Sequence, residues 1–180
     1  MDDPVIRTVG HSSRTFDELA QVLAAHGIRR LVDVRRYPGS RRHPQFDRVR
    51  LAPALEREEV AYRHAEALGG MRECSPGSPH VALDDPAFRG YAEHMATAAF
   101  VAALDELIAW ARGAHTTVMC AERSPGECHR AFLADALVVR GVRVVHLLDE
   151  RTVREHALHP AAVWEGGRLV YRGPQESLGL

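Results

Sequence analysis

The segment 120–130 offers two thiols and an imidazole, together with carboxylate and guanidinium groups, within eleven residues. If the helix that follows starts near Cys128, its free N–H groups favour an anion and stabilise a thiolate at that position. Cys128 is therefore a candidate reactive group, and Glu122 and His129 are candidates for acid–base work. The structural alternative is that Cys120 is a small core residue at a strand end and that His129 only begins the helix.

The same residue types allow a metal site as an alternative. Cys120, Cys128 and His129 are metal-ligand types, and His11 could supply a fourth ligand. A usual zinc knuckle has ligand pairs spaced about two to four residues apart, which this segment lacks. We therefore predict no cofactor and no metal ligands, with a divalent metal kept as the alternative.

An arginine-rich stretch is the second chemical feature. Residues 29–50 contain eight arginines against two aspartates, Asp33 and Asp47. Guanidinium forks match phosphate oxygens, and aromatic rings such as Tyr37 stack on bases. We expect an anion or substrate site here, because prolines stiffen the loop 35–42. Its candidate residues are Ser12, Arg35, Arg41, Arg42 and Arg130. Alternatively, the loop is a solvated, salt-bridged surface segment.

The elements that position these residues follow from the hydrophobic periodicity. The expected strands are 5–9, 28–34, 60–64, 116–119 and 142–148. Helices are expected from the N-cap Thr15 to Gly27, at about 48–59, at 88–94, at 100–113 and at 130–140. Near the C-terminus, 162–164 and 169–171 flank a glycine-containing turn, which predicts a hairpin.

These elements predict an α/β fold, with a three-layer, mostly parallel sheet, helices on both of its faces and a C-terminal β-hairpin. We expect a single domain over residues 1–180, with its core at about 5–150 and the hairpin at about 160–172.

Three of the predicted strands end in polar groups. His11 follows the first strand, Asp33 and Arg35 end the second, and Cys120 follows the fourth. Because functional groups gather outside the carboxyl ends of parallel strands, this convergence predicts a site at that edge. We interpret the remaining histidines, among them His146 and His156, as structural or surface residues.

Composition limits the possible mechanisms and locations. The chain of 180 residues is 46% hydrophobic, carries a formal net charge of −1 and contains neither lysine nor asparagine. P-loop NTPases and Schiff-base enzymes need a lysine, so both classes are excluded. The odd number of cysteines predicts reduced thiols. Without a signal segment or a run of roughly 18 apolar residues, we expect a cytoplasmic protein with no membrane association.

An ordered set of short motifs resembles a known family. The motifs are 8–12, 31–35 with Pro38 and 40–41, then 68–70, 88–91, 120–122 and 128–130. Together they resemble the family called domain of unknown function 488, over roughly residues 5–172. The resemblance implies the α/β fold but no established reaction, although members often carry a DNA-repair label. The positions that match motif residues are His11, Ser12, Asp33, Arg35, Arg41, Glu122, Cys128, His129 and Arg130.

The first functional hypothesis is a hydrolase- or lyase-like enzyme acting on a phosphate-bearing substrate. The substrate would be a nucleotide or nucleic acid, with DNA repair as one setting. Arg35, Arg41 and Arg130 would hold the anion while Asp33 orients an arginine or histidine. The candidate catalytic residues are Glu122, Cys128, His129, Asp33 and His11.

Two further hypotheses stay open. One is a cysteine-based sulfur-transfer or redox protein that uses Cys120 and Cys128. In the cysteine loops of phosphatases and sulfurtransferases an arginine or backbone amides lie within about six residues of the cysteine, but here Arg130 is ten residues from Cys120, so the likeness is topological only. The other is a non-catalytic module that binds nucleic acid or a protein partner through the arginine loop.

Overall fold

The computed structural model describes residues 4–172 and has a six-stranded main sheet, in the order β3-β2-β4-β1-β5-β6. The parallel strands are β1 (Val5–Gly10), β2 (Arg30–Asp33), β3 (Ala61–His64), β4 (Thr116–Cys120) and β5 (Arg143–Leu147). The last strand, β6 (Val153–Glu155), pairs antiparallel to β5. The predicted domain spans residues 1–180. Its ends, residues 1–3 and 173–180, lie outside the described residues, as does the N-terminus for which no signal segment was expected.

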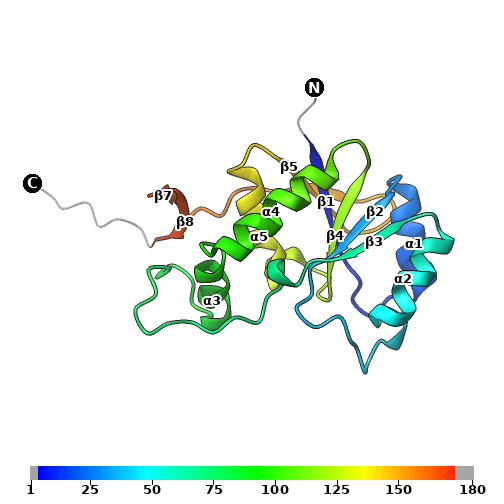
Figure 1. The fold of residues 1–180 in the computed structure, drawn as a ribbon, viewed down its shortest axis with the longest axis horizontal. Coiled ribbons are helices and arrows are strands. Elements are labelled where there is room, and N and C mark those ends of the chain that lie inside the picture. Colours follow the sequence, from blue (N-terminus) through cyan, green and yellow to red (C-terminus); the bar gives the residue numbers. More distant parts are fainter. Residues whose placement is uncertain (1–3, 173–180) are drawn as a thin grey trace, which may run out of the picture.

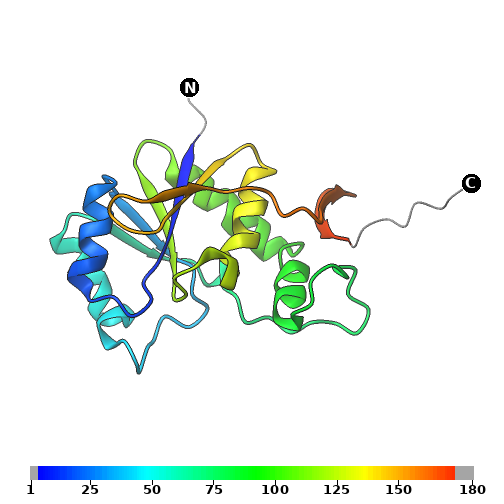
Figure 2. The same ribbon diagram turned by 180° about the vertical axis from the view of Figure 1, so that it is seen from behind.

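Helices cover both faces of the main sheet (Figures 1 and 2). They are α1 (Phe16–Ala25), α2 (Arg48–Arg57), α3 (Pro86–His94), α4 (Ala98–Ala111) and α5 (Arg130–Val138). One apolar cluster joins α1 and α2 to the sheet, and a second joins α3, α4 and α5 to the opposite face. The adjacent residues Val118 and Met119 belong to different clusters, because successive side chains of a strand point to opposite faces. The predicted three-layer α/β fold is confirmed.

Local signals set the boundaries of α1. The Thr15 hydroxyl accepts from the backbone N–H of Glu18, and the Glu18 carboxylate accepts from the backbone N–H of Thr15. This capping box supplies acceptors for two backbone donors at the start of the helix. Gly27 follows the helix with φ at +62°, a conformation that glycine adopts without a steric penalty.

The predicted C-terminal hairpin is present as a separate two-stranded sheet of β7 (Ala162–Glu165) and β8 (Arg168–Tyr171). Leu169 and Tyr171 of β8 are buried in the same cluster as α3 and α5. The edge strand β6 was not predicted, because all three of its residues are exposed and show no burial pattern. The loop after β2 contains a short 3-10 turn, Pro44–Phe46, before α2 begins.

Within residues 4–172, no single helix has the length and apolar composition needed to cross a membrane. Only α3 and α4 taken together pass that test, and the chain bends by 75° at the break between them. Tyr91 of α3 and Phe100 of α4 are buried against the sheet, so these helices supply the core.

The variant Gly10→Ala tests how closely the end of β1 approaches the loop after β4. A Cβ atom at Gly10 would overlap the backbone carbonyl of Glu122, which cannot rotate away as a side chain can. We expect the substitution to lower the free energy of unfolding by about 1–3 kcal/mol, as overpacking does. Denaturant unfolding measures this loss. Gly77→Ala is the control, because its added Cβ meets nothing within 4 Å, and equal stability of the two variants would contradict the close approach.

Candidate active site

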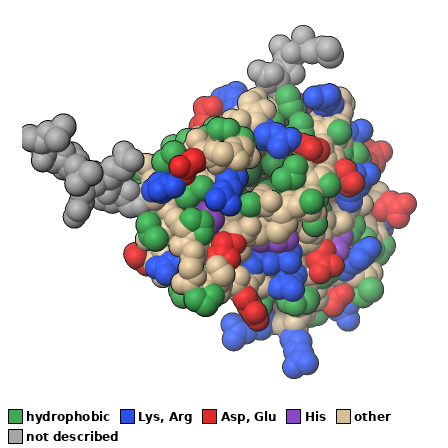
Figure 3. Space-filling model, turned by 60° about the vertical axis from the view of Figure 1, so that its left-hand side comes forward, with side chains coloured by type: hydrophobic (Ala, Val, Ile, Leu, Met, Phe, Trp, Pro, Cys, Tyr) green, Lys and Arg blue, Asp and Glu red, His purple; other side chains and the backbone are tan. Residues whose placement is uncertain are grey.

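A cavity of about 740 Å³ opens at the carboxyl ends of the parallel strands. It is lined by residues that follow β1, by the loop after β2 and by the segment between β4 and α5. Figure 3 views a face on which histidine and arginine side chains lie close together. Ligands of open α/β sheets bind at this edge. The structure therefore brings the polar strand ends together, as the sequence predicted.

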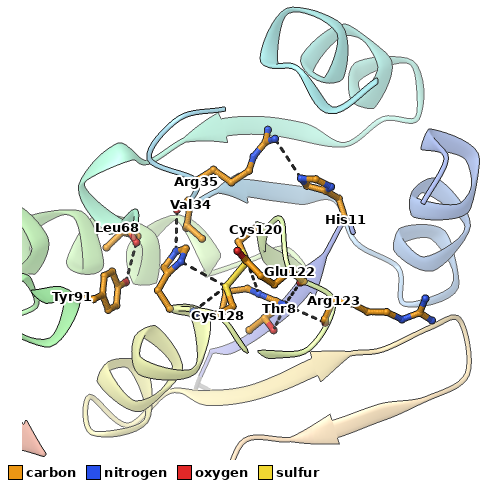
Figure 4. Close-up of a disulfide and its surroundings, with 12 residues drawn as sticks. Thr8, His11, Val34, Arg35, Leu68, Tyr91, Cys120, Glu122, Arg123 and Cys128 are labelled. Atoms are coloured by element: carbon orange, nitrogen blue, oxygen red, sulfur yellow. Dashed lines mark hydrogen bonds between the residues drawn. A yellow bond between two sulfur atoms is a disulfide. The ribbon is translucent and has the colours of Figure 1, made fainter. Parts of the chain in front are cut away.

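Cys120 and Cys128 lie side by side in this cavity (Figure 4). The structure pairs their sulfur atoms as a disulfide, and their Cα atoms, 7.8 Å apart, are more widely separated than in most disulfides. The sequence predicted reduced thiols. Cys74 is free, as predicted, but the prediction is wrong for the other two, because the 3-10 turn Pro125–Glu127 folds the chain back between Cys120 and Cys128. Both residues are at most 2% exposed. The cavity, which both residues line, is therefore the route of access to the two sulfur atoms.

The buried side chain of Arg130 contacts Cys120. Its Nε–H donates to Cys120 Sγ at 3.0 Å, its Nη1 to Thr8 Oγ1 at 3.2 Å and its Nη2 to the carbonyl of Glu122 at 2.6 Å. Burial lowers the pKa of Arg130 to about 10, so the group stays charged at neutral pH. The sequence placed Arg130 on a substrate anion, but the side chain is 1% exposed and does not line the cavity.

Glu122 and His129 approach the two sulfur atoms. Glu122 Oε2 lies 3.0 Å from Cys120 Sγ, and His129 Nδ1 lies 3.6 Å from Cys128 Sγ. His129 Nε2 lies 3.1 Å from the carbonyl of Val34, so Nε2 carries the hydrogen and Nδ1 presents its lone pair to the sulfur. Burial lowers the pKa of His129 to about 4, so the ring is neutral at neutral pH. Each sulfur thus has a proton acceptor within reach.

Asp33 orients an arginine, in the way the sequence analysis expected. Arg35 donates from Nε to Oδ1 of Asp33 at 2.9 Å and from Nη2 to Oδ2 at 2.6 Å. Tyr62 donates its hydroxyl to the same Oδ2 at 2.9 Å. This two-point geometry offsets the desolvation of a buried ion pair. Arg35 lines the cavity, whereas Asp33 is fully buried behind it.

His11 lines the cavity directly after β1. Its Nδ1 lies 2.9 Å from the carbonyl of Ser12, its Nε2 lies 3.5 Å from Nη1 of Arg35, and its ring stacks on Phe46. Burial, and then the charge of Arg35, lower the pKa of His11 to about 4, although the hydrogen bond to Ser12 opposes this. Ser12 has a positive φ of 49°, so its backbone adopts the strained left-handed conformation beside the cavity.

Arg41 and Arg42 are exposed and line the cavity from the loop after β2. Within residues 4–172 neither takes part in an ion pair. Both guanidinium groups therefore reach the cavity, and the anion binding expected of them stays a prediction. Arg36, which was not singled out, also lines the cavity, with its guanidinium over the ring of Tyr37.

Three residues that the sequence analysis gave no role complete the site. Tyr62 fixes Asp33, and Thr8 accepts from Arg130. Gly70 leaves room for a neighbouring ring, since a Cβ there would lie 2.8 Å from Nδ1 of His129. Two of them had a signal, because Thr8 belongs to the motif 8–12 and Gly70 to the motif 68–70.

A family model described as Domain of unknown function DUF488 matches residues 15–137. The chain belongs to this family. The matched span of the DUF488 protein includes Asp33, Arg35 and the whole segment from Cys120 to Arg130, but not His11 or the C-terminal hairpin. The family is confirmed as predicted, and its description names no activity. No curated protein and no solved structure matches the chain.

Acid should destabilise the protein through His11. Its folded-state pKa of about 4 lies below the ordinary value of 6.5. Between these pH values the unfolded chain binds a proton that the folded chain does not, so stability falls as the pH drops through this window. One such histidine contributes at most about 3 kcal/mol. We expect the unfolding free energy of His11→Phe, measured in urea, to fall less than that of the wild type between neutral pH and pH 4. Identical slopes of unfolding free energy against pH in the two proteins would contradict the lowered pKa of His11.

Proposed function

We propose that this protein is a cysteine-dependent enzyme that performs redox or sulfur-transfer chemistry at Cys120 and Cys128. One observation carries the proposal. The two sulfur atoms are bonded to each other beside an open cavity, and the buried guanidinium of Arg130 donates to one of them. A cation next to a cysteine is typical of reactive rather than structural thiols.

The surroundings assign different roles to the two cysteines in the reduced form. A thiol at Cys120 can pass its proton to Glu122, and the resulting thiolate accepts from Arg130 Nε–H. Cys128 stands at the start of α5, where the backbone N–H of Arg130 is 3.5 Å from its sulfur. We therefore assign Cys120 as the attacking cysteine and Cys128 as the resolving one.

The proposed reaction exchanges a sulfur–sulfur bond. The Cys120 thiolate attacks a sulfur of a substrate disulfide, a mixed disulfide forms, and the first substrate thiolate leaves with the proton from Glu122. Cys128 then attacks Cys120 Sγ while its proton passes by way of His129 to the departing substrate thiolate. The Cys120–Cys128 bond forms, and the second substrate thiolate leaves with that proton.

Electrons balance in this scheme, because the substrate disulfide gains two and the protein dithiol loses two. An external dithiol returns the protein to its reduced form by the reverse exchange. When the attacked atom is the outer sulfur of a persulfide, the first step instead transfers that sulfur to Cys120. The cavity volume of about 740 Å³ suits a small-molecule substrate.

Reaction with glutathione disulfide tests this scheme. We expect the reduced wild-type protein to form the Cys120–Cys128 disulfide and to release two equivalents of glutathione. Cys128→Ser should stop at one bound glutathione on Cys120, because the resolving thiol is gone, and Cys120→Ser should not react in the cavity. Intact-protein mass spectrometry distinguishes these products.

The control is Cys74→Ser, because Cys74 is a free cysteine that does not line the cavity. This variant should react as the wild type does. Modification of the wild type at Cys74 alone would contradict the proposed function.

A divalent metal is the alternative occupant of the reduced pair. The ligand-type atoms of Cys120, Cys128 and His129 lie within 4.8 Å of one another. The disulfide takes both sulfur atoms out of such a site, so metal and disulfide exclude each other. Metal analysis of the reduced protein decides between them. One zinc per chain retained against a chelator would favour the metal, whereas no retained metal supports free thiols.

A phosphate-bearing substrate is the second candidate, and it is supported by the unpaired guanidinium groups of Arg41 and Arg42 at the cavity. A nucleotide would place its phosphates there and stack its base on an exposed ring such as Tyr37, which is 60% exposed. Glu122 and His129 would then act as acid and base. The nucleic-acid and DNA-repair hypotheses depend on the same arginines and require a strand to bind with a steep salt dependence.

The double substitution of Arg41 and Arg42 by alanine tests the phosphate candidate. We expect it to weaken binding of ATP by about tenfold or more, because each charge-assisted hydrogen bond contributes about 1.5–3 kcal/mol. Calorimetric titration measures the change. The matched control replaces Arg48 and Arg50, which are exposed on α2 and do not line the cavity. Equal affinities of the two double variants would reject this candidate.

A further inference from the structure

A chain of hydrogen bonds runs from Arg130 to Asp135, two residues of the same helix. Arg130 Nη1 donates to Thr8 Oγ1, which lies 2.7 Å from His146 Nδ1. On its other side, His146 Nε2 lies 3.0 Å from His156 Nδ1, and His156 Nε2 lies 2.7 Å from Asp135 Oδ1. This chain of hydrogen bonds therefore begins at the first residue of α5 and ends on the same helix, five residues later.

The chain is buried between α5 and the sheet. Thr8 of β1, His146 of β5 and Asp135 of α5 are each at most 3% exposed. Thr8 and His146 are register partners on adjacent strands. None of these side chains lines the cavity, and the thiol exchange described above does not use them.

The acceptor end of the chain is fixed by Asp135. Its carboxylate accepts from the backbone N–H of His159 and from the hydroxyl of Tyr171. It therefore also accepts from His156 Nε2, which leaves Nδ1 of that ring to face His146. The donor end is fixed by Arg130, because a guanidinium only donates.

One proton arrangement gives every hydrogen of the chain an acceptor. Burial is the largest cause that lowers the pKa of His146, to about 3, so this ring is neutral and has a single N–H. Thr8 then donates to His146 Nδ1, and His146 Nε2–H donates to His156. All four hydrogen bonds point from the Arg130 cation toward the Asp135 carboxylate. Bonds in such a chain polarise and strengthen one another.

We propose that Thr8, His146, His156 and Asp135 are positioning residues that hold the Arg130 guanidinium with its Nε–H toward Cys120. The inference rests on the proposed thiol function. A guanidinium is planar, so fixing Nη1 on Thr8 also fixes the direction of Nε. Without this anchor the guanidinium is held only through Nη2, which donates to the carbonyls of Glu122 and Arg123, and its Nε–H can tilt away from the sulfur.

Thr8→Val tests the inference, because it removes the hydroxyl and keeps the shape of the side chain. We expect the midpoint of the pH–rate profile for Cys120 alkylation by iodoacetamide in the reduced full-length protein to rise by about one pH unit, so that the rate below this midpoint falls by about tenfold. Thr8→Ser keeps the hydroxyl and should restore the wild-type rate. Asp135→Asn removes the acceptor charge at the far end of the chain and should slow Cys120 in the same direction.

Tyr171→Phe is the matched control for a purely structural role. It removes a hydrogen bond to the same Asp135 carboxylate but leaves the chain to Arg130 intact. We expect this variant to lose thermal stability without any change in the alkylation rate. Equal slowing in Tyr171→Phe and Thr8→Val would overturn the inference, as would a wild-type rate in Thr8→Val.

A second measurement separates the inference from the proposed function. Exchange of the Arg130 Nε–H with solvent, followed by NMR on protein labelled with ¹⁵N-arginine, reports the position of the guanidinium whether or not Cys120 reacts. Slow exchange in the wild type and Thr8→Ser, with fast exchange in Thr8→Val, supports the positioning chain. If the exchange rates follow this pattern but Cys120 of the wild type is unreactive, the proposed thiol function is rejected and the positioning chain is retained. Equal exchange in all three proteins overturns the positioning chain.

Discussion

The buried positive charge of Arg130 is the constraint on which the site depends. A guanidinium that is 1% exposed needs acceptors on every side, and here they come from β1, from the end of β4 and from the loop before α5. Gly10 is part of the same arrangement, because a Cβ there would lie 2.9 Å from Arg130 Nη2. Pairing this one group therefore fixes the relative positions of two strands, a loop and a helix.

The acceptors of the buried arginines Arg35 and Arg130 differ, and the difference points to the chemistry. Arg35 is paired directly with the carboxylate of Asp33. Arg130 forms no ion pair among residues 4–172, and its acceptors are a hydroxyl, backbone carbonyls and the sulfur of Cys120. Of these, only the sulfur can gain a full negative charge. Reduction of the disulfide therefore supplies the anion that this cation otherwise lacks, which favours the thiolate.

Much of the fold could be predicted from the sequence, because periodicity and capping are local. The strands alternate with helices, Thr15 and Glu18 form the predicted capping box, and the glycine pair 166–167 marks the hairpin turn. The edge strand β6 could not be found, since its pairing with β5 leaves no buried face.

The site could be predicted in part, because parallel strands deliver their ends to one edge. The direction in which each side chain points could not be predicted from the sequence. Arg130 points into the protein and not into the cavity, and the pairing of Cys120 with Cys128 depends on a turn that no periodicity marks. His146 and His156 were interpreted as structural or surface residues, and only their three-dimensional contacts reveal the chain to Arg130.

The ultraviolet absorbance of the thiolate in the reduced protein at neutral pH tests the central claim most directly. It is best measured on the double variant Cys74→Ser with Cys128→Ser, so that only Cys120 contributes. The account predicts the full signal of one thiolate, and its loss when acid is added or the protein is unfolded. Absence of thiolate absorbance in the folded variant at neutral pH would contradict the account, because Cys120 would then be a protonated core residue despite its contact with Arg130.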